Sequence, residues 1–490
     1  MDELTPLSDA TLGTLPEAVR VPRYDRTGLS AGIVHIGLGN FHRAHQAWYL
    51  HRLMDAGLAH DWAILGAGVR APDAAMRARL MAQDGLTTLI ELDPEGTSAE
   101  VTGAMTGFLP VEPDNAALVA AMADPAIRIV GLTVTEGGYF RDAGGAFDPT
   151  HPDIVHDAAH PDAPRTAFGA MVAALRLRRA AGAGAFTGLS SDNLQGNGDA
   201  LRAAVVGLAR LQDPALADWI GGEARFPNAM VDCIVPATGP AEIALAHGFG
   251  VADAAPVTHE PFRQWVIEDD FAAGRPDWDA AGATFVGDVH AHEAMKLRIL
   301  NAGHQLLANA GEVMGLATIA DCMAHPALAA FFARVQAEEI APHVDAVPGM
   351  PPADYVALVT RRFANPMIRD TVRRVAFDGS SRHPTFLLPT LRDRLAAGGD
   401  VDGLALAEAA WCRMCEGVRE DGTAIEANDP AWDALRAAAL AARDDPRAWL
   451  AQAAVYGDLG AHPVLAGRFA HWLGVVRGEG MAAALRRYAP

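Results

Sequence analysis

The order of apolar runs along the chain constrains its fold more than any other feature of the sequence. In the first half, short and almost uninterrupted apolar segments alternate with stretches of helical pattern. The five segments are Gly32–Leu38, Trp62–Val69, Ile127–Thr135, Ala185–Ser190 and Met230–Val235. Strands that are apolar throughout are typical of a parallel sheet covered by helices on both faces. The first half is therefore predicted to be an α/β domain.

The second half of the chain has a different pattern. From about Ala291 onward, long stretches rich in Ala, Leu and Arg follow one another with Gly or Pro between them, and strand signals become scarce. Such stretches favour helix, and Gly and Pro mark their ends. We therefore expect two domains, an α/β domain at residues 1–285 and a mostly α-helical domain at residues 286–490.

Charge and cysteine content narrow the class of protein. The 490 residues include 60 acidic and 39 basic side chains, which gives a formal net charge of −21. Nucleic acids and anionic membranes repel such a chain, so neither is an expected partner. Four cysteines do not make a disulfide framework, and the N-terminus lacks the pattern of a signal peptide. We expect a cytoplasmic protein that is a monomer or a small homo-oligomer.

Two motifs that could suggest metal binding are interpreted otherwise. Cys412 and Cys415 form a C-x-x-C without a second pair, inside an apolar helical run, which favours two buried thiols. The segment 142–164 carries three histidines but is interrupted by proline, and we interpret it as a solvated loop. No metal site is therefore predicted.

A glycine turn after the first apolar segment predicts where a nucleotide binds. Gly37 and Gly39 form a G-x-G, which Asn40 and Phe41 follow at the start of a helix, and His42 stands where a third glycine is usual. The glycines permit a tight turn and a close approach of pyrophosphate, towards which the helix directs its first N–H groups. The position between strand and helix strengthens a motif that is weak when taken alone.

The second apolar segment should be followed by an acid that binds the adenosine ribose. Asp73, four residues after Val69, is the only nearby candidate. A carboxylate there favours NAD over NADP because it repels a 2′-phosphate, whereas Arg70 argues for the opposite preference. Asp73 could equally be the N-cap of a helix over 74–81. NAD is the expected cofactor, and NADP is the less favoured alternative.

The basic side chains hold the most unusual count in the sequence, because Lys296 is the only lysine among 39 Lys and Arg. Arginine cannot lose its proton in a protein, whereas lysine can when its pKa is lowered. On a helix that turns about 100° per residue, Lys296 shares an arc of about 140° with three other polar residues. These are Glu293, Asn301 and His304. Three leucines interleave with them, which indicates a cleft rather than bulk water.

The same helical projection places the remaining residues of this helix. Met295, Ile299 and Leu306 form an apolar face that is expected in the core. Arg298 and Gln305 fall at the expected solvent edge. A further residue, Gly303, leaves room for a close approach by another backbone or a ligand.

An amine, an amide and an imidazole in one cleft suit hydride transfer at an alcohol carbon. Neutral Lys296 can accept the hydroxyl proton, and Asn301 can donate to the developing alkoxide. Asn193 follows the fourth apolar segment, at a strand end where open α/β sheets bind ligands, and could add a second amide. The alternatives are a surface position for Lys296, a core histidine for His304 and a turn residue for Asn193.

Longer segments carry a resemblance to a known family. From about residue 30 to beyond residue 380, the sequence resembles the mannitol 2-dehydrogenase family of polyol-specific long-chain dehydrogenases. The resemblance implies an N-terminal Rossmann-type domain, a largely helical C-terminal domain, and metal-independent, NAD(H)-linked oxidation of a polyol at C2 or reduction of the ketose. The matching segments are Gly37–Leu50, Leu132–Tyr139, Ser190–Gly198, Phe226–Asp232, Glu260–Phe271, Met295–His304 and Asp378–Arg382.

The resemblance also implies the residues that perform the reaction. Lys296 matches the general base of the family. Asn193 and Asn301 match the pair of amides that polarises the reacting oxygen. His304 matches a group that orients the substrate.

Further positions match residues around the reaction. Asp232 and Arg374 match groups that hold the sugar chain. Glu293 lies where the family has a carboxylate near the proton exit path. Asp73 matches the acid that binds the ribose. Gly37, Gly39, Asn40 and Phe41 belong to the matched nucleotide motif.

Three positions depart from the family pattern. Cys233 replaces the usual arginine, Arg382 replaces a lysine near the substrate, and Pro72 replaces an acidic residue. The leading hypothesis is a dehydrogenase for mannitol, arabinitol or glucitol. The alternative is a hexuronate reductase acting on fructuronate or tagaturonate, because Arg382 could bind the carboxylate of such a substrate.

Overall fold

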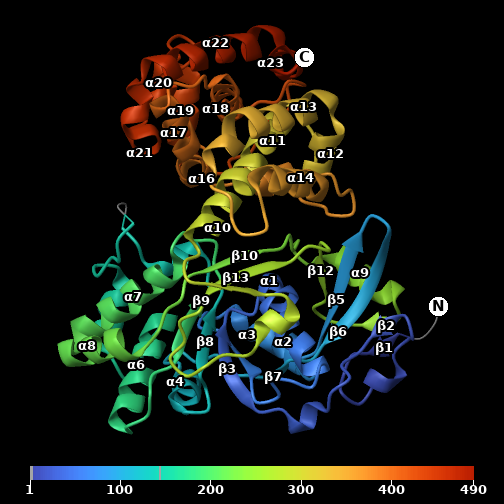
Figure 1. The fold of residues 1–490 in the computed structure, drawn as a ribbon, viewed down its shortest axis with the longest axis vertical. Helices are drawn as coiled ribbons and strands as arrows, with labels where there is room; N and C mark the ends of the chain where they lie inside the picture. The colour runs from blue at the N-terminus through green and yellow to red at the C-terminus, as the bar shows by residue number, and fades with distance from the viewer. Residues whose placement is uncertain (1–3, 143–144) are drawn as a thin grey trace. The chain divides into compact units, whose positions relative to one another are not determined.

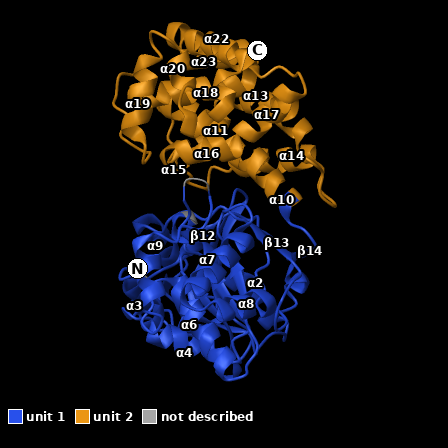
Figure 2. Cartoon of the chain, turned by 90° about the vertical axis from the view of Figure 1, so that its left-hand side faces the viewer, with its two compact units in different colours: residues 1–290 blue, residues 291–490 orange. Residues whose placement is uncertain are grey.

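The chain divides into two units in the computed structural model, which describes residues 4–142 and 145–490. Unit 1 is Met1–His290 and unit 2 is Ala291–Pro490 (Figure 2). Unit 1 contains all the strands, and unit 2, whose residues are all described, contains helices and no strand (Figure 1). The predicted fold class, an α/β domain followed by a mostly helical one, is confirmed.

A five-stranded parallel sheet is the framework of unit 1. Its order is β7-β4-β3-β8-β9, and all four neighbouring pairs are parallel. The strands are β3 (Ala31–Ile36), β4 (Ala63–Ala67), β7 (Met105–Phe108), β8 (Ile129–Leu132) and β9 (Thr187–Ser190). The chain order reverses direction between β3 and β8, which is where sheets of this type leave a crevice for a ligand.

Both faces of this sheet are covered, as continuous apolar strands predict. Val34 and Val130 pack with residues of α4 (Ala116–Ala123), α6 (Ala167–Ala180) and α7 (Asn197–Gln212) on one face. On the other face, Ile33 and Ile129 pack with α2 (Gln46–Asp55), β10 (Ala229–Asp232) and β13 (Gln264–Glu268). Alternate residues of a strand therefore contribute to two separate cores.

The fifth predicted strand forms but does not join the parallel sheet. It is β10, which pairs antiparallel with β13 in a sheet of order β10-β13-β14. A continuous apolar run shows that a strand is buried and not which neighbour it pairs with. Two further sheets, β12-β5-β6-β2 and β1-β11, lack a predicted counterpart. The strands are β1 (Thr5–Pro6), β2 (Val19–Arg20), β5 (Thr87–Asp93), β6 (Gly96–Thr102), β11 (Val251–Ala252), β12 (Val257–His259) and β14 (Thr284–Val286).

The histidine-rich segment is not a solvated loop throughout, as the sequence led us to expect. It contains α5 (Pro152–Ala159), with His151 as N-cap and Pro152 at the first position, where proline favours a helix start. Residues 143 and 144 of the segment lie outside the described residues. The other helices of unit 1 are α1 (Asn40–Ala44), α3 (Asp73–Met81), α8 (Pro214–Glu223) and α9 (Pro240–Gly248).

Unit 2 is built around α18, which packs against both α11 and α22. Cys412 and Cys415 are buried, unbridged thiols on α18, as predicted, and burial raises the pKa of each. The helices are α10 (His290–Met295), α11 (Ala302–Val313), α12 (Ile319–Ala324), α13 (Pro326–Val335), α14 (Pro352–Phe363), α15 (Val372–Val375), α16 (Gly379–Phe386), α17 (Leu388–Ala396), α18 (Asp402–Cys415), α19 (Trp432–Ala441), α20 (Arg447–Leu450), α21 (Ala453–Tyr456), α22 (Pro463–Glu479) and α23 (Met481–Tyr488).

Two stretches of unit 2 form π-helical turns, η5 (Lys296–Asn301) and η6 (Gln336–Ile340). Turns of this type are rare and are found frequently at functional sites. Within the described residues, none of the helices combines the length and the hydropathy needed to span a membrane.

Candidate active site

The glycine turn of unit 1 connects β3 to α1 at the crevice of the sheet. Gly37 has φ of +97°, and a Cβ there would lie 2.2 Å from the carbonyl oxygen of Thr133. Gly39 precedes α1, and a Cβ there would meet no atom within 4 Å. Residue 37 must thus be glycine because a side chain would collide with Thr133, whereas Gly39 leaves open space for a ligand to approach the backbone.

The two residues after the turn use their side chains within the protein. Asn40 donates to the carbonyl oxygen of Pro236 and to Oγ1 of Thr238, each at 2.9 Å. Phe41 stacks on His45 with ring centroids 4.9 Å apart. These side chains therefore anchor α1. Any contact that residues 40 and 41 make with a nucleotide falls to their backbone, which begins the helix.

His42, in place of the third glycine, packs against a second imidazole. Its ring lies 3.5 Å from that of His35 on β3, and both residues are only 2% exposed. His35 Nε2 lies 3.0 Å from Oγ1 of Thr133, whose hydroxyl donates to the carbonyl oxygen of Gly37. Burial lowers the pKa of His35 to about 3 and that of His42 well below its usual value. Two stacked, neutral imidazoles thus support the turn, through the hydrogen bonds from His35 to Thr133 and from Thr133 to Gly37. The G-x-G pattern does not reveal this role.

A cavity of about 440 Å³ opens at the carboxyl ends of β3 and β8. Gly37, Asp73 and Thr133 line it, together with Arg70 and Arg165. Asp73 begins α3, and its Oδ2 accepts a hydrogen bond from the backbone N–H of Arg70 at 3.0 Å. The N-cap alternative for Asp73 was wrong, because Pro72 is the N-cap of α3 and no side chain in the described part of the chain caps this helix. Asp73 is the first helical residue and lines the cavity, so its role at the ribose stays a prediction.

Gly68 allows Asp73 to take this position. A Cβ on Gly68 would lie 2.3 Å from the Cβ of Asp73. Asp73 can therefore line the same cavity as Gly37 only because residue 68 has no side chain.

Two predicted site residues lie at strand ends of unit 1. Asn193 is exposed and follows β9 by three residues. Asp232 is the last residue of β10, is 4% exposed and pairs in register with Gln264 of β13. Both side chains lie at the carboxyl end of their strand, as expected for residues that contact a ligand.

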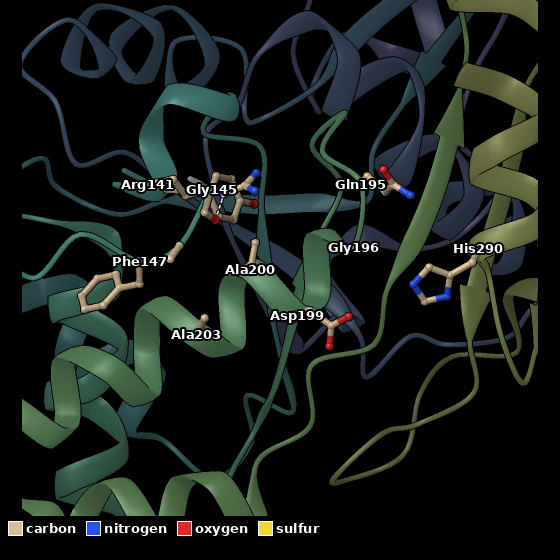
Figure 3. A pocket seen from close by; sticks show the side chains of 11 residues that line it. Arg141, Gly145, Phe147, Gln195, Gly196, Asp199, Ala200, Ala203 and His290 are labelled. Atoms are coloured by element: carbon tan, nitrogen blue, oxygen red, sulfur yellow. Dashed lines mark hydrogen bonds between the residues drawn. The ribbon is translucent and has the colours of Figure 1, made fainter. Parts of the chain in front are cut away.

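A second cavity, of about 480 Å³, lies beside α7 (Figure 3). Arg141, Asp199 and His290 are among its lining residues, and none of the predicted site residues is. Within the described residues, Glu268, Asp288 and His290 bring possible metal-ligand atoms within 4.8 Å of one another. Asp288 and His290 are exposed, and exposed acidic groups of this kind are not by themselves a metal site.

The lysine helix of unit 2 begins with α10 and continues through η5 into α11. Lys296 is the first residue of η5 and is 7% exposed, and Glu293, one turn earlier, is 4% exposed. Lys296 is therefore not a surface lysine. Asn301 closes η5, and its side-chain oxygen is buried without a hydrogen-bond partner in the described parts of the chain. A buried polar atom of this kind is a candidate for binding a ligand.

The π-helical turn changes the geometry that a regular helix predicts. Residues in a π-helix bond to the fifth residue along, so each adds less rotation than the expected 100°. Met295, Ile299 and Leu306 are buried as predicted. Gln305, which we expected at the solvent edge, is 1% exposed and donates to the carbonyl oxygen of Val375 at 3.0 Å. The expectation was wrong because α12, α13, α15 and α18 all pack against α11, so almost every residue of this helix is buried and position 305 has no solvent edge.

A buried glutamine supports the π-helical turn. Gln336 is fully buried, and its Nε2 donates to the carbonyl oxygen of Ile299 at 2.8 Å. Gly303 makes this possible, since a Cβ there would lie 2.8 Å from Phe332 and 2.9 Å from Nε2 of Gln336. The close approach that Gly303 permits is thus made by side chains, and not by a backbone or ligand as the sequence suggested.

His304 and two arginines meet around a residue that the sequence reasoning missed. Asp370 is 4% exposed, lies 3.7 Å from Nε2 of His304 and forms an ion pair with Arg374 at 2.6 Å. His304 also stacks on Phe363, with ring centroids 4.1 Å apart. Burial raises the pKa of Asp370, and Arg374 opposes that rise. The signal in the sequence was the spacing of an acid and an arginine four residues apart.

Arg382 lies beside this group. Its Nη1 donates to the carbonyl oxygen of Val375 at 2.7 Å and to that of Arg374 at 3.4 Å. The structure thus brings together three of the predicted substrate residues of unit 2, His304, Arg374 and Arg382, through Asp370 and the backbone of α15.

These features define the class of protein. A parallel sheet with a glycine turn at its crevice, followed by a helical unit that carries a buried lysine, is a Rossmann-type oxidoreductase. The sequence model of the mannitol dehydrogenase Rossmann domain matches residues 31–280, and that of the mannitol dehydrogenase C-terminal domain matches residues 288–476. The chain belongs to the mannitol dehydrogenase family, and the resemblance seen in the sequence is confirmed.

Individual relatives agree with this assignment. The mannitol 2-dehydrogenase of Cereibacter sphaeroides is 58% identical over 474 residues, which cover 97% of this chain and 99% of the relative. The mannitol 2-dehydrogenase of Phaeosphaeria nodorum is 42% identical over 446 residues, 90% of this chain and 78% of the relative.

Two solved structures share the whole fold. The ternary complex of Pseudomonas fluorescens mannitol 2-dehydrogenase with NAD and D-mannitol has a TM-score of 0.91 at 38% identity and covers 99% of both chains. A D-sorbitol dehydrogenase in substrate-free form has a TM-score of 0.88 at 36% identity, covering 98% of this chain and 100% of the other.

Proposed function

We propose that the chain oxidises a polyol at C2 to the ketose with NAD, and catalyses the reverse reaction, without a metal and with Lys296 as the general base. The observation that carries this proposal is that the only lysine of the chain is buried at the start of a π-helical turn. We assign nucleotide binding to residues 1–285 and the lysine-centred chemistry to residues 286–490.

The residues around the cavity of unit 1 fit a dinucleotide. The open space at Gly39 and the N–H groups of α1 suit a pyrophosphate, and the carboxylate of Asp73 suits the two hydroxyls of an adenosine ribose. NAD, when bound, supplies the acceptor for the hydride that leaves C2. Asp73 favours NAD, because the 2′-phosphate of NADP would face this carboxylate.

Proton transfer is assigned to the lysine helix. Neutral Lys296 accepts the proton of the C2 hydroxyl, and the amides of Asn193 and Asn301 donate to the oxygen as negative charge develops on it. Glu293 lies three residues before Lys296 on the same helix and passes the proton onward. A permanently charged arginine at residue 296 could not accept a proton.

Substrate binding is assigned to four further residues. His304 is oriented by Phe363 and Asp370 and donates to a substrate hydroxyl. Arg374, Arg382 and Asp232 hold the remaining hydroxyls of the chain. These roles are supported by the burial of Asp232, by the pairing of Arg374 with Asp370, and by the bonds of Arg382 to the backbone of α15.

A substrate panel with both cofactors tests the proposal. D-Mannitol, D-arabinitol and D-glucitol are compared with D-fructuronate and D-tagaturonate, each with NAD(H) and NADP(H). We expect NAD-linked turnover of at least one polyol, with mannitol favoured because the relatives are named for it. Turnover of the uronates alone would contradict the proposal and establish the hexuronate reductase. A chelator such as EDTA is expected to leave activity unchanged.

A further inference from the structure

Thr135, at the edge of the nucleotide cavity, has an unusual backbone conformation. Its φ of +70° and ψ of 160° fall in a region that is essentially restricted to glycine. Thr133, Val134 and Thr135 follow β8 and line the cavity beside Gly37. A strained residue of this kind persists only where its surroundings hold it in place, and such residues cluster at functional sites.

The group that holds Thr135 is the carboxylate of Asp192. Its Oδ1 accepts the backbone N–H of Thr135 at 2.9 Å, and its Oδ2 accepts that of Val134 at 3.1 Å. The hydroxyl of Tyr139 donates to Oδ2 at 2.8 Å. The backbone carbonyl of Asp192 in turn accepts from Nδ2 of Asn197, at the start of α7, at 3.0 Å. Asp192 is 8% exposed, so these bonds are shielded from water.

We propose that Asp192 is a positioning residue for NAD, which holds the Val134–Thr135 backbone in the shape that the cavity requires. This inference rests on the proposed function. Two adjacent N–H groups bind one carboxylate oxygen each, an arrangement that an amide cannot reproduce, because its nitrogen is itself a donor. Asp192 also precedes Asn193, so its two hydrogen bonds connect the loop after β8 to the loop that carries the proposed catalytic amide.

A matched control separates positioning from general stability. Asp253 is 2% exposed and also accepts two backbone N–H groups, those of Thr88 at 2.6 Å and Ala255 at 2.7 Å, and one side-chain donor, Gln83, at 2.8 Å. It lies outside the residues that line the cavity. Asp192→Asn and Asp253→Asn therefore break equivalent sets of hydrogen bonds in the same unit.

The experiment measures NADH affinity by fluorescence titration and stability by urea unfolding. We expect Asp192→Asn to raise the NADH dissociation constant about 10- to 100-fold, as loss of a hydrogen bond to a charged group predicts. Asp253→Asn should stay within about threefold of the unaltered chain, although both variants lose stability. Equal affinity in Asp192→Asn and the unaltered chain would overturn the inference.

A rescue by glycine gives the sharper test. With Thr135→Gly, the backbone conformation at residue 135 carries no steric strain, so it depends less on the hydrogen bonds from the Asp192 carboxylate. The double variant Asp192→Asn/Thr135→Gly should therefore bind NADH within about fivefold of Thr135→Gly alone, a coupling that independent sites do not show. Additive losses in the double-mutant cycle would contradict the proposal.

Two further measurements keep the test decisive. If Asp192→Asn does not fold, Tyr139→Phe removes one hydrogen bond to the same carboxylate, together with the bond between the Tyr139 hydroxyl and Oγ of Ser190. We expect it to raise the NADH dissociation constant about 3- to 10-fold. No change in that variant would overturn the inference. Failure of the unaltered chain to bind NADH would instead overturn the proposed function.

Discussion

The glycine turn of unit 1 and the lysine helix of unit 2 build their sites in opposite ways. At the turn, the surface proposed to face the ligand is backbone, and the buried groups that support it are the neutral imidazoles of His35 and His42. On the helix, the surface proposed to face the ligand consists of side chains, and the buried supports are an amide and a carboxyl group, Gln336 and Asp370. Backbone sites depend on local conformation, whereas side-chain sites depend on which distant residues pack behind them.

The largest effect that we expect is the loss of turnover when Lys296 is replaced. Lys296→Ala should lower kcat by about 10²- to 10⁴-fold, in keeping with general-base catalysis, and change the NADH dissociation constant by less than about threefold. Lys296→Arg should be nearly as damaging, because its charge cannot be lost. Steady-state kinetics and NADH titration measure the two quantities separately.

The control for this prediction is a cation on the same helix. Arg298 donates to the carbonyl oxygen of His343 and to Asp393, away from the proposed chemistry. Arg298→Ala should leave kcat within about threefold of the unaltered chain, since its ion pair with a half-exposed partner contributes little. Near-normal turnover by Lys296→Ala would refute the mechanism.

The second prediction concerns the support of the π-helical turn. Gln336→Leu leaves the carbonyl of Ile299 without its donor, which should destabilise the protein by about 1–3 kcal/mol. Because Lys296 and Asn301 stand at the two ends of that turn, kcat should also fall about tenfold. Urea unfolding and kinetics with the same preparation test both effects.

The same substitution in unit 1 is the matched control. Gln83 is 4% exposed and donates to the carbonyl oxygen of Leu86 at 2.8 Å. Gln83 also donates to Oδ1 of Asp253 and accepts the backbone N–H of Ala254, so Gln83→Leu should cost at least as much stability, with little change in kcat. If both variants lost activity in proportion to stability, the π-helical turn would have no special role in catalysis.

The third prediction is that mild acid weakens unit 1 before unit 2. The pKa of His35 is about 3 in the folded chain against 6.5 in the unfolded chain, and burial lowers the pKa of His259 to about 3 as well. The unfolded state therefore binds more protons below pH 6.5, so stability is lost as the pH falls from 6.5 towards 3. His35 alone should account for about 2 kcal/mol by pH 5.

Two buried carboxyl groups of unit 2 respond differently to acid. Burial raises the pKa of Asp370 and of Glu339, so the folded state binds their protons more readily and loses no stability through them as the pH falls. Hydrogen exchange at pH 7 and pH 5, corrected for intrinsic rates, should show protection lost in residues 4–142 and 145–290 first. Earlier loss in unit 2 would be the contrary result.

The smallest predicted effect concerns Asp370. Asp370→Asn keeps the size of the side chain but removes the charge that pairs with Arg374 and faces His304. We expect KM for the polyol to rise about tenfold, with the NADH dissociation constant unchanged. Asp393→Asn, which affects the half-exposed partner of Arg298, serves as the control and should leave KM unaltered.

The sequence by itself determined what depends on near neighbours in the chain. The apolar segments around β3, β4, β8 and β9 indicated buried parallel strands, because apolar periodicity is a local record of burial. Gly37 was recognisable because a tight turn between strand and helix needs a positive φ. The apolar face of the lysine helix was likewise correct at Met295 and Ile299.

Only the tertiary structure decided what depends on residues far apart in the chain. It showed that β10 pairs with β13, that His42 rests on His35, that Gln336 supports a π-helical turn and that Asp370 joins His304 to Arg374. A regular helical projection misplaced Gln305 for the same reason, since several helices from elsewhere in the chain cover α11 on almost every side. Hydrogen bonds of buried groups must be satisfied by whatever packs against them, and no local pattern specifies that partner.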